Sequence, residues 1–169
     1  MLDVFSSRSR QIVFAARFKA GERGAGMIDA DDFLIGLVLE DQGMLEKEIF
    51  SSFLGGQGDA QDASVNGVQS HIPFLSSKVA QELLANLKKN LPQSRPIALT
   101  TEVPLSPSLV RVFDSAKAIQ AQFRHSQVEP LHLLAAILTQ GADQSVKLLN
   151  EAGITYEKVL LKLSSASGN

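Results

Sequence analysis

One pattern of residues occurs twice in this chain, one hundred positions apart. Residues 28–38 read IDADDFLIGLV and residues 128–138 read VEPLHLLAAIL, with apolar character preserved along the match. The same offset holds from Phe5 to Asp41 without a gap, and a shift of one residue then aligns residues 49–50 with 148–149. A self-match at a fixed offset indicates a duplicated structural unit whose copies bury their apolar faces against each other. We therefore expect the function to depend on what the two copies form together.

The composition favours helices over sheets. Hydrophobic residues make up 44% of the 169 residues, with a single Tyr and no Trp. Leucine and alanine, which favour helices, are used heavily. A chain of this length buries a substantial core in one domain. We predict an all-α fold in which residues 1–169 form a single domain.

Helical periodicity predicts four helices in the first copy, the first of them capped by Ser6 or Ser7. Asp29 is the expected N-cap of the second helix, which is apolar around most of its circumference and is therefore predicted to be central. Residues 55–71 are rich in Gly, Ser and Asp, and we predict a mobile loop there. The predicted boundaries of repeat 1 are about 1–91, with helices over about 6–23, 30–40 and 44–54 and from Ser76 or Ser77 to about Asn90.

A proline-rich connector precedes the second copy. Four of the six prolines lie from Pro92 to Pro107, which predicts an extended segment over residues 92–105. Ser106 followed by Pro107 is a strong helix start signal, because proline is preset for the first helical turn. Repeat 2 is expected over about 106–165, with helices over about 106–124, 130–140, 143–152 and 156–165.

The sequence contains no recognisable catalytic constellation. It has no cysteine, no G-x-x-x-x-G-K-[ST] phosphate loop and no G-x-S-x-G nucleophile motif. The three histidines, His71, His125 and His132, lie in separate segments without an i,i+4 partner, so no metal site is expected. We predict no enzymatic activity, no cofactor and no metal.

The polar residues at the starts of the second helices have structural explanations. Capping and compensation of the helix dipole account for Asp29, Asp31 and Asp32, and acid–base chemistry is the less favoured explanation. Asp31 and Asp32 are expected at the surface, where their removal changes stability by no more than about 1–2 kcal/mol. His132 is expected to be a hydrogen-bonded histidine in the first turn of a buried helix.

The charge pattern does not favour nucleic acid or membrane partners. Sixteen basic and eighteen acidic residues leave a net charge of −2, and the basic residues are scattered, whereas phosphate binding needs a clustered basic face. There is no apolar run long enough for a membrane span and no signal-peptide pattern at the start. The absence of cysteine fits a reducing compartment. We predict a cytoplasmic protein.

Residues 128–138, which include Glu-Pro-Leu-His-Leu, resemble a motif in the amino-terminal repeat domain of the Clp family of AAA+ protein unfoldases. Residues 150–154 resemble the family's turn between the third and fourth helices of a repeat. Residues 71–74 and 103–107 both resemble the segment with which the family enters its second repeat. The resemblance covers nearly the whole chain. It implies two tandem four-helix repeats packed as a pseudo-twofold globule of eight helices, which docks proteins for an ATPase ring.

One branch of that family accepts phosphorylated arginine through a threonine and a glutamate in each repeat. Here the threonine positions hold Ser6 and Ser106, and the glutamate positions hold Asp31 and Leu131. Half of the charge pattern is absent, so we do not carry phosphoarginine binding over to this chain. Leu131 fits the disaggregase branch better, in which an apolar groove accepts unfolded segments.

The preferred interpretation is a non-enzymatic module that binds unfolded or tagged protein clients, adaptor proteins or a Clp ATPase ring. A stand-alone accessory protein and a part of a larger ATPase are both compatible with the sequence. A helical regulator that binds DNA is the alternative, although the charge pattern does not support it. The residues expected to bind protein partners lie around the paired helix starts: Phe5, Ser6, Arg8, Asp31, Asp32, Leu105, Ser106, Leu131 and His132.

Overall fold

The computed structural model describes residues 2–50, 73–98, 101–140 and 143–167. These residues form helices joined by turns and extended segments, with two isolated β-bridges, which confirms the predicted all-α fold. The helical elements are α1 (Ser7–Glu22), α2 (Ala30–Asp41), η1 (Glu46–Phe50), α5 (Ser77–Asn90), α6 (Pro107–Gln122), α7 (Pro130–Gln140), α8 (Asp143–Glu151) and α9 (Tyr156–Ser167).

Side chains cap the helices at the positions that the sequence predicts. The hydroxyl oxygen of Ser6 accepts the N–H of Ser9 at 3.2 Å, and that of Ser106 accepts the N–H of Leu109 at 3.1 Å. Asp29 begins α2 as the predicted N-cap. These caps satisfy backbone donors that have no partner inside the helix, and they fix where each helix begins.

The segment after α2 differs from the prediction. Instead of an α-helix over residues 44–54, the described part contains the π-helical turn η1. Leu45 immediately precedes this turn and Ile49 lies within it, and both side chains are buried. A π-helical turn closes i→i+5 hydrogen bonds and is wider than an α-helical turn. The remaining residues of that predicted helix, 51–54, and the predicted loop at 55–71 lie outside the described residues.

Two short parallel pairings join the repeats in a symmetric way. Phe5 pairs with Val128, while Leu105, the counterpart of Phe5, pairs with Ile28, the counterpart of Val128. Exchanging the two repeats therefore reproduces the same pairing, as a pseudo-twofold arrangement requires. The backbone hydrogen bonds follow this symmetry, from the N–H of Ser6 to the Val128 carbonyl (3.1 Å) and from the N–H of Ser106 to the Ile28 carbonyl (2.9 Å).

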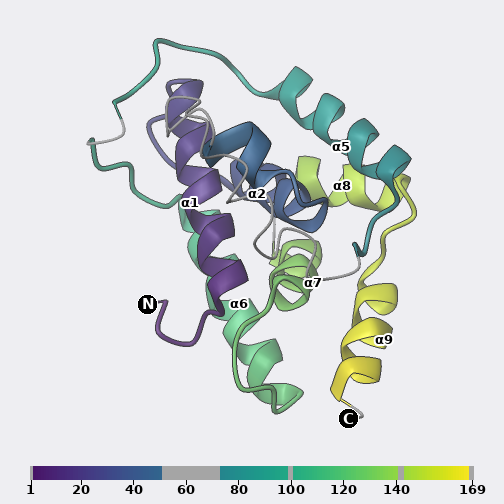
Figure 1. The fold of residues 1–169 in the computed structure, drawn as a ribbon. Helices are drawn as coiled ribbons and strands as arrows, with labels where there is room; N and C mark the ends of the chain where they lie inside the picture. Colours follow the sequence, from purple (N-terminus) through teal and green to yellow (C-terminus); the bar gives the residue numbers. More distant parts are fainter. Residues whose placement is uncertain (1, 51–72, 99–100, 141–142, 168–169) are drawn as a thin grey trace.

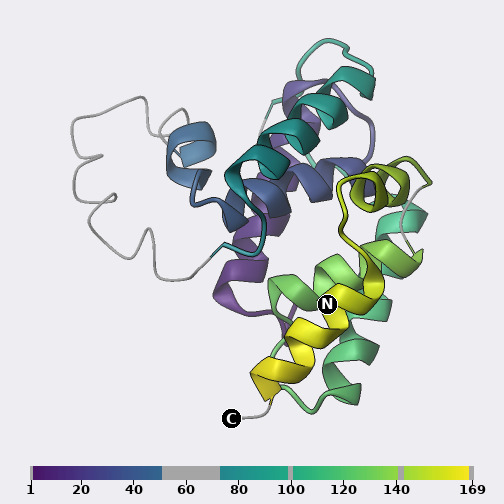
Figure 2. The same ribbon diagram turned by 90° about the vertical axis from the view of Figure 1, so that its right-hand side faces the viewer.

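Helices α2 and α7 lie at the centre of the molecule (Figure 1). They contact each other, α1 packs against both, and α6 packs against both in the same way. Helix α5 packs against α2 and α8, and α9 packs against α7, so that α5 and α9 lie towards opposite ends of the view in Figure 2. The central core contains Phe33, Leu34, Leu133 and Leu134, none of which is more than 1% exposed. Burial of these apolar faces holds the repeats together.

Candidate functional site

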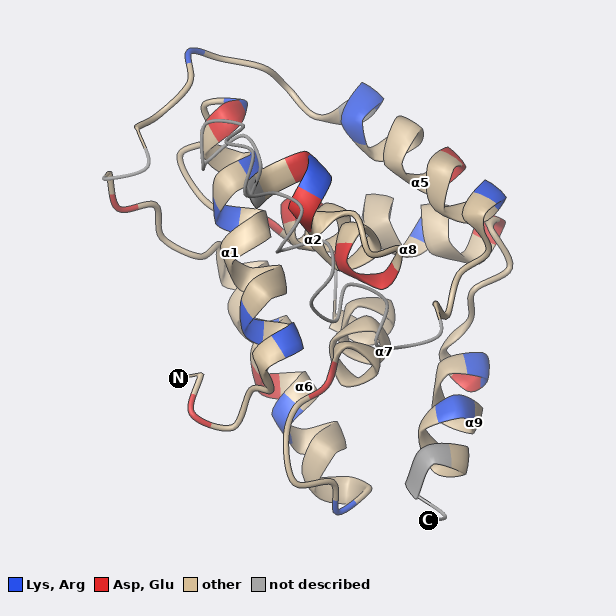
Figure 3. Ribbon diagram, in the orientation of Figure 1, with Lys and Arg blue, Asp and Glu red and all other residues tan. Residues whose placement is uncertain are grey.

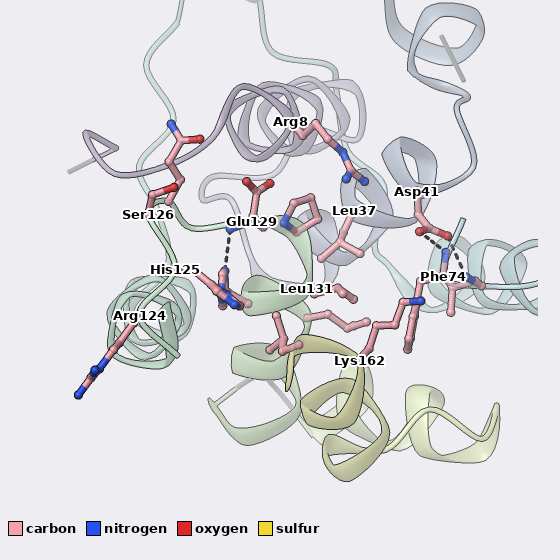
Figure 4. Close-up of a pocket in the computed structure, with 16 residues that line it drawn as sticks. Arg8, Leu37, Asp41, Phe74, Arg124, His125, Ser126, Glu129, Leu131 and Lys162 are labelled. Atoms are coloured by element: carbon pink, nitrogen blue, oxygen red, sulfur yellow. Dashed lines mark hydrogen bonds between the residues drawn. The ribbon is translucent and has the colours of Figure 1, made fainter. Parts of the chain in front are cut away.

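A cavity of about 750 Å³ lies between the two repeats (Figure 4). The first repeat contributes side chains from α1, α2 and the segment before α5. The second repeat contributes the loop between α6 and α7, the α7 helix itself and α9. We call this cavity the inter-repeat pocket, and Arg8, Leu37, Phe74, Glu129, Leu131 and Lys162 mark its extent.

Apolar side chains form the base of the inter-repeat pocket. Leu37 and Leu134 come from the two central helices and Leu163 comes from α9, and all three are buried. Leu131 and Phe74 are half-buried, so part of each apolar surface remains open to an incoming group. In Figure 4, Leu37 and Leu131 lie in the middle of the lining side chains. A partner side chain buried on such a surface gains about 1.5–3 kcal/mol.

The wall that contains Phe74 is anchored to the end of α2. The carboxylate of Asp41 accepts the N–H of Phe74 at 2.8 Å and the N–H of Leu75 at 3.1 Å. The side-chain amide of Gln42 donates to the Leu75 carbonyl at 2.9 Å. Asp41 is only 7% exposed, and in this setting hydrogen bonds to a carboxylate are strong. Phe74 is therefore held in place at the pocket.

Arg8 lies on the rim with its charge already matched. Its Nε and Nη2 donate to the two carboxylate oxygens of Glu40 at 2.7 and 2.9 Å. Burial disfavours the charged guanidinium, but the hydrogen bonds and the charge of Glu40 outweigh this effect and raise the pKa of Arg8. Glu40 thus satisfies Arg8, and Asp41 holds the segment at Phe74, so the charged lining residues left to meet a partner are Glu129, Lys162 and Arg124.

Two histidines meet at the wall formed by the loop between α6 and α7. Nδ1 of His125 lies 2.7 Å from Nε2 of His132, and Nδ1 of His132 accepts the N–H of Glu129 at 2.8 Å. His132 is fully buried and hydrogen-bonded in the first turn of α7, as predicted. Burial, with a smaller contribution from the nearby His125, lowers the pKa of His132 to about 4. The ring of His125 also stacks on Phe123, with centroids 5.7 Å apart.

The pseudo-twofold counterpart of this wall lies in the first repeat, beside a smaller cavity of about 470 Å³. Residues 24–27, the counterparts of 124–127, line it together with Asp31 and Ser106. Pro92 and Ser94 of the connector, together with Leu91 before them, supply a further wall. We call this cavity the first-repeat pocket. The two pockets are thus built on equivalent turns, but of the two only the first-repeat pocket has the connector against it.

Hydrogen bonds attach the connector to the end of α1. The N–H of Ser94 donates to the Arg23 carbonyl at 2.7 Å, and the N–H of Ile97 donates to the Gly21 carbonyl at 2.8 Å. Gly24, with φ of +74°, permits this approach, because a Cβ there would lie 2.3 Å from the Arg95 carbonyl oxygen. Its counterpart, Arg124, has a similar φ of +59° and carries a full side chain. A chain segment therefore cannot approach the second repeat as closely.

The structure distributes the predicted binding residues over several places. Arg8, Leu131 and His132 line the inter-repeat pocket, whereas Asp31 and Ser106 line the first-repeat pocket. The four other residues have different surroundings: Phe5 and Ser6 are buried, Leu105 is half-buried in a β-bridge, and Asp32 pairs with Arg23. The nine residues do not form one continuous site.

The expectation that Asp32 lies at the surface is wrong. Asp32 is 0% exposed, and its carboxylate accepts Nε and Nη2 of Arg23 at 2.7 and 2.8 Å and the N–H of Asp29 at 3.0 Å. The hydrogen bond to Asp32 raises the pKa of Arg23. Asp31 is half-buried, where it accepts a hydrogen bond from Ser145 of α8, and burial raises its pKa. Both carboxylates therefore contribute to packing within and between the repeats.

Several lining residues were not expected from the sequence. Phe74 precedes α5, His125 follows α6, and Lys162 lies on α9, so no local motif links them. The meeting of His125 and His132 had one weak signal, since the two residues flank a single helix start seven positions apart. His71, the third histidine, lies outside the described residues.

The described residues offer little support for other kinds of site. Among them, no group of three or more His, Cys, Asp or Glu side chains is placed to hold a metal ion. None of the helices in this part of the chain combines the length and apolarity that a membrane crossing requires. Along the ribbon in Figure 3, Lys and Arg are spread over α1, α5 and α9 and alternate with acidic residues.

Comparisons with known proteins give a family match over part of the chain and a shared fold over nearly all of it. Residues 106–169 match the model of the Clp repeat (R) N-terminal domain. No protein with a curated description matches the sequence. One similar solved structure is the N-terminal domain of the caseinolytic protease associated chaperone ClpD from Arabidopsis thaliana, with 16% identity, 99% of this chain and 96% of that chain covered, and a TM-score of 0.61. Another comes from structural investigations of a malarial protein secretion system, with 16% identity, 97% and 95% coverage, and a TM-score of 0.68.

Proposed function

We propose that this chain, which has the fold of a Clp N-terminal domain, binds a segment of a client or adaptor protein in the inter-repeat pocket. The match of residues 106–169 to the Clp repeat model supports this proposal. The bound protein is then passed to an AAA+ ATPase ring. Clp N-terminal domains are non-catalytic modules, and the proposed role needs no reaction centre in this chain.

One observation carries the proposal: the inter-repeat pocket has an apolar base formed by both repeats. Leu131 is central to it, because it lies half-buried on α7 between Leu37 of the first repeat and the α9 side chains. Polar groups of both signs surround this base, including Glu129 and Lys162. An apolar base with a mixed polar rim suits an extended polypeptide, whose apolar side chain enters while its backbone groups meet the rim.

The test measures binding of a short unstructured peptide of Leu, Ala, Gly, Ser and Lys, labelled with tetramethylrhodamine, by fluorescence anisotropy. Leu131→Asp gives the second repeat the carboxylate that Asp31 supplies in the first. A charge on the apolar base removes the gain from burial, so we expect the peptide to bind about tenfold more weakly or worse.

Leu161→Asp is the matched control. Leu161 lies on α9 next to the lining residue Lys162, but its side chain is 71% exposed and does not line the pocket. The same change in charge at this position should leave binding within about twofold, and thermal melting should show that both variants fold. Equal affinity of wild type and Leu131→Asp, or no binding by the wild type, would refute the proposed site.

A further inference from the structure

The hydrogen bonds of the histidine pair run in one direction. The backbone N–H of Glu129 can only donate, so Nδ1 of His132 accepts and carries no proton. In a neutral imidazole the proton then resides on Nε2, and Nε2–H of His132 donates to Nδ1 of His125. The proton of His125 is therefore on its own Nε2. The cap of α7 thus fixes both tautomers.

A single additional proton is incompatible with this arrangement. On His132 the proton would occupy Nδ1, where it would face the N–H of Glu129 as a second donor. On His125 it would occupy Nδ1, where it would face Nε2–H of His132 across 2.7 Å. Moving the His132 proton from Nε2 to Nδ1 relieves the second conflict only by creating the first. Whichever ring gains the proton, one of the two side-chain hydrogen bonds between the loop and His132 is lost.

The surrounding charges do not provide a substitute for the lost bonds. Arg124 lies next to His125 in the loop but points away from it in Figure 4, Arg8 of α1 is paired with Glu40, and Lys162 of α9 lies on the opposite side of the pocket. The acidic groups are Glu129 at the start of α7 and Asp41 of α2. The carboxylate of Asp41 already accepts the N–H groups of Phe74 and Leu75. Glu129 is thus the main acidic group available near the pair.

We propose that the His125–His132 pair makes the inter-repeat pocket pH-sensitive: one proton taken up by the pair breaks a side-chain hydrogen bond between His132 and the loop before α7, which loosens this wall and weakens protein binding there. The effect on binding rests on the proposed function, whereas the loosening of the wall does not. The lowered pKa of His132 fits an environment that resists a proton.

The first repeat has no such device at the equivalent place. Asp32 occupies the position of His132, and it accepts both the N–H of Asp29 and the guanidinium of Arg23. A carboxylate–guanidinium pair keeps its charges between pH 5 and 8, the range in which histidine is the usual side chain to change charge. The sensitivity therefore belongs to the second repeat and to the pocket that it lines.

Nuclear magnetic resonance of the ¹⁵N-labelled wild-type chain tests the loosening directly. At pH 7.5 both imidazoles should show the Nε2–H tautomer. On going to pH 4.0, near the pKa of His132, the amide signals of residues 124–129 should shift together, and hydrogen exchange at Glu129 should lose about tenfold of its protection after correction for the intrinsic rate. The Nδ1–H tautomer of His132 at pH 7.5, or a loop whose signals do not change with pH, would overturn the proposal.

His132→Asn is the matched variant, because its side-chain oxygen can still accept the N–H of Glu129 but does not titrate. The peptide used above, labelled on its α-amino group and amidated at its C-terminus, contains no group that titrates between pH 4 and 8. Because the pKa of His132 is about 4, wild type should bind it about twofold more weakly at pH 4.0 than at pH 7.5, and His132→Asn should change by less than about 1.3-fold. An equal loss in both proteins would refute the control of binding by the pair. Failure to bind at pH 7.5 would count against the proposed function, while the magnetic resonance result would still decide whether the wall loosens.

Discussion

The two repeats pair through the same backbone contacts but differ in the side chains that stabilise the start of the central helix. In the first repeat, Asp32 caps α2 and forms a salt bridge with Arg23. In the second, His132 caps α7 and contacts His125, and the position equivalent to Arg23 holds Phe123. The same helical position is thus served by a charged pair in one copy and by two neutral rings in the other. Duplication preserved the cap and allowed its chemistry to diverge.

The surroundings of these caps diverged in parallel. The connector covers one side of the first-repeat pocket, where Gly24 leaves room for it. The equivalent turn of the second repeat carries Arg124 and lines the inter-repeat pocket. Because the connector is part of the chain, it stabilises the first repeat without any partner. This difference favours the second repeat for the protein binding that we propose.

The largest expected effect distinguishes the two caps. Asp32→Ala leaves the guanidinium of Arg23, whose side chain is only 12% exposed, without its partner, and it also removes the cap of α2. Breaking a buried pair in this way costs about 3–5 kcal/mol. His132→Ala removes only neutral hydrogen bonds and should cost about 1–3 kcal/mol. Urea denaturation measures both values, and equal losses would contradict the distinction between a charged and a neutral cap.

A second pair of variants tests what the repeats share. Leu34 and Leu134 occupy equivalent positions in α2 and α7, and they are 0% and 1% exposed. Replacing either by Ala removes buried methyl groups and leaves a cavity, at a cost of about 2–5 kcal/mol each. We expect similar losses in thermal or urea unfolding. A change in melting temperature of under a degree or two for one of them would show that the copies do not contribute equally to the core.

The features that the sequence predicts well are local or periodic. The offset of one hundred residues, the N-caps at Ser6, Asp29 and Ser106, and the central position of the second helices all follow from neighbouring residues. Helix capping involves groups only a few positions apart, so a short stretch of sequence contains the necessary information. The structure agrees with these predictions because packing did not override them.

The features that the sequence does not reveal depend on contacts across the fold. Asp32 was expected at the surface because nothing near it in the helix marks it as buried, and its partner Arg23 lies at the end of the preceding helix. The inter-repeat pocket joins side chains from Arg8 to Leu163, which no local pattern connects. The role of Gly24 becomes visible only when the connector is seen against it.

The pH dependence of stability gives a smaller effect with a defined sign. The folded-state pKa of His132, about 4, is below the ordinary value of 6.5, so the unfolded chain binds more protons between these values. This contribution to stability is present above about pH 6.5 and is lost as the pH falls towards 4, at up to about 1.4 kcal/mol per pH unit.

The difference in stability between wild type and His132→Asn isolates this contribution. The raised pKa of Asp31 changes the free energy of unfolding in the opposite direction with pH. The protonated form of Asp31 is favoured in the folded state, so its contribution to stability is lost as the pH rises. Asp31 is present in both proteins and cancels in the difference. Urea titrations from pH 7.5 to 4.5 should show wild type losing its advantage as the pH falls, and a constant difference would contradict the assigned sign.

The smallest expected effects concern the turns that distinguish the two pockets. Gly24→Ala places a side chain at φ of +74° and 2.3 Å from the Arg95 carbonyl oxygen, so it should destabilise the fold by about 1–2 kcal/mol and loosen the connector. Arg124→Gly relieves a left-handed residue with φ of +59° but makes the unfolded chain more flexible, and these opposing effects should leave stability within about 1 kcal/mol of wild type.

Hydrogen exchange of Ser94 and Ile97, whose N–H groups donate to the end of α1, is the sensitive measurement. Exchange at both should accelerate in Gly24→Ala and stay unchanged in Arg124→Gly, because the connector contacts only the first repeat's turn. Unchanged protection in Gly24→Ala would mean that the missing side chain is not what lets the connector lie there.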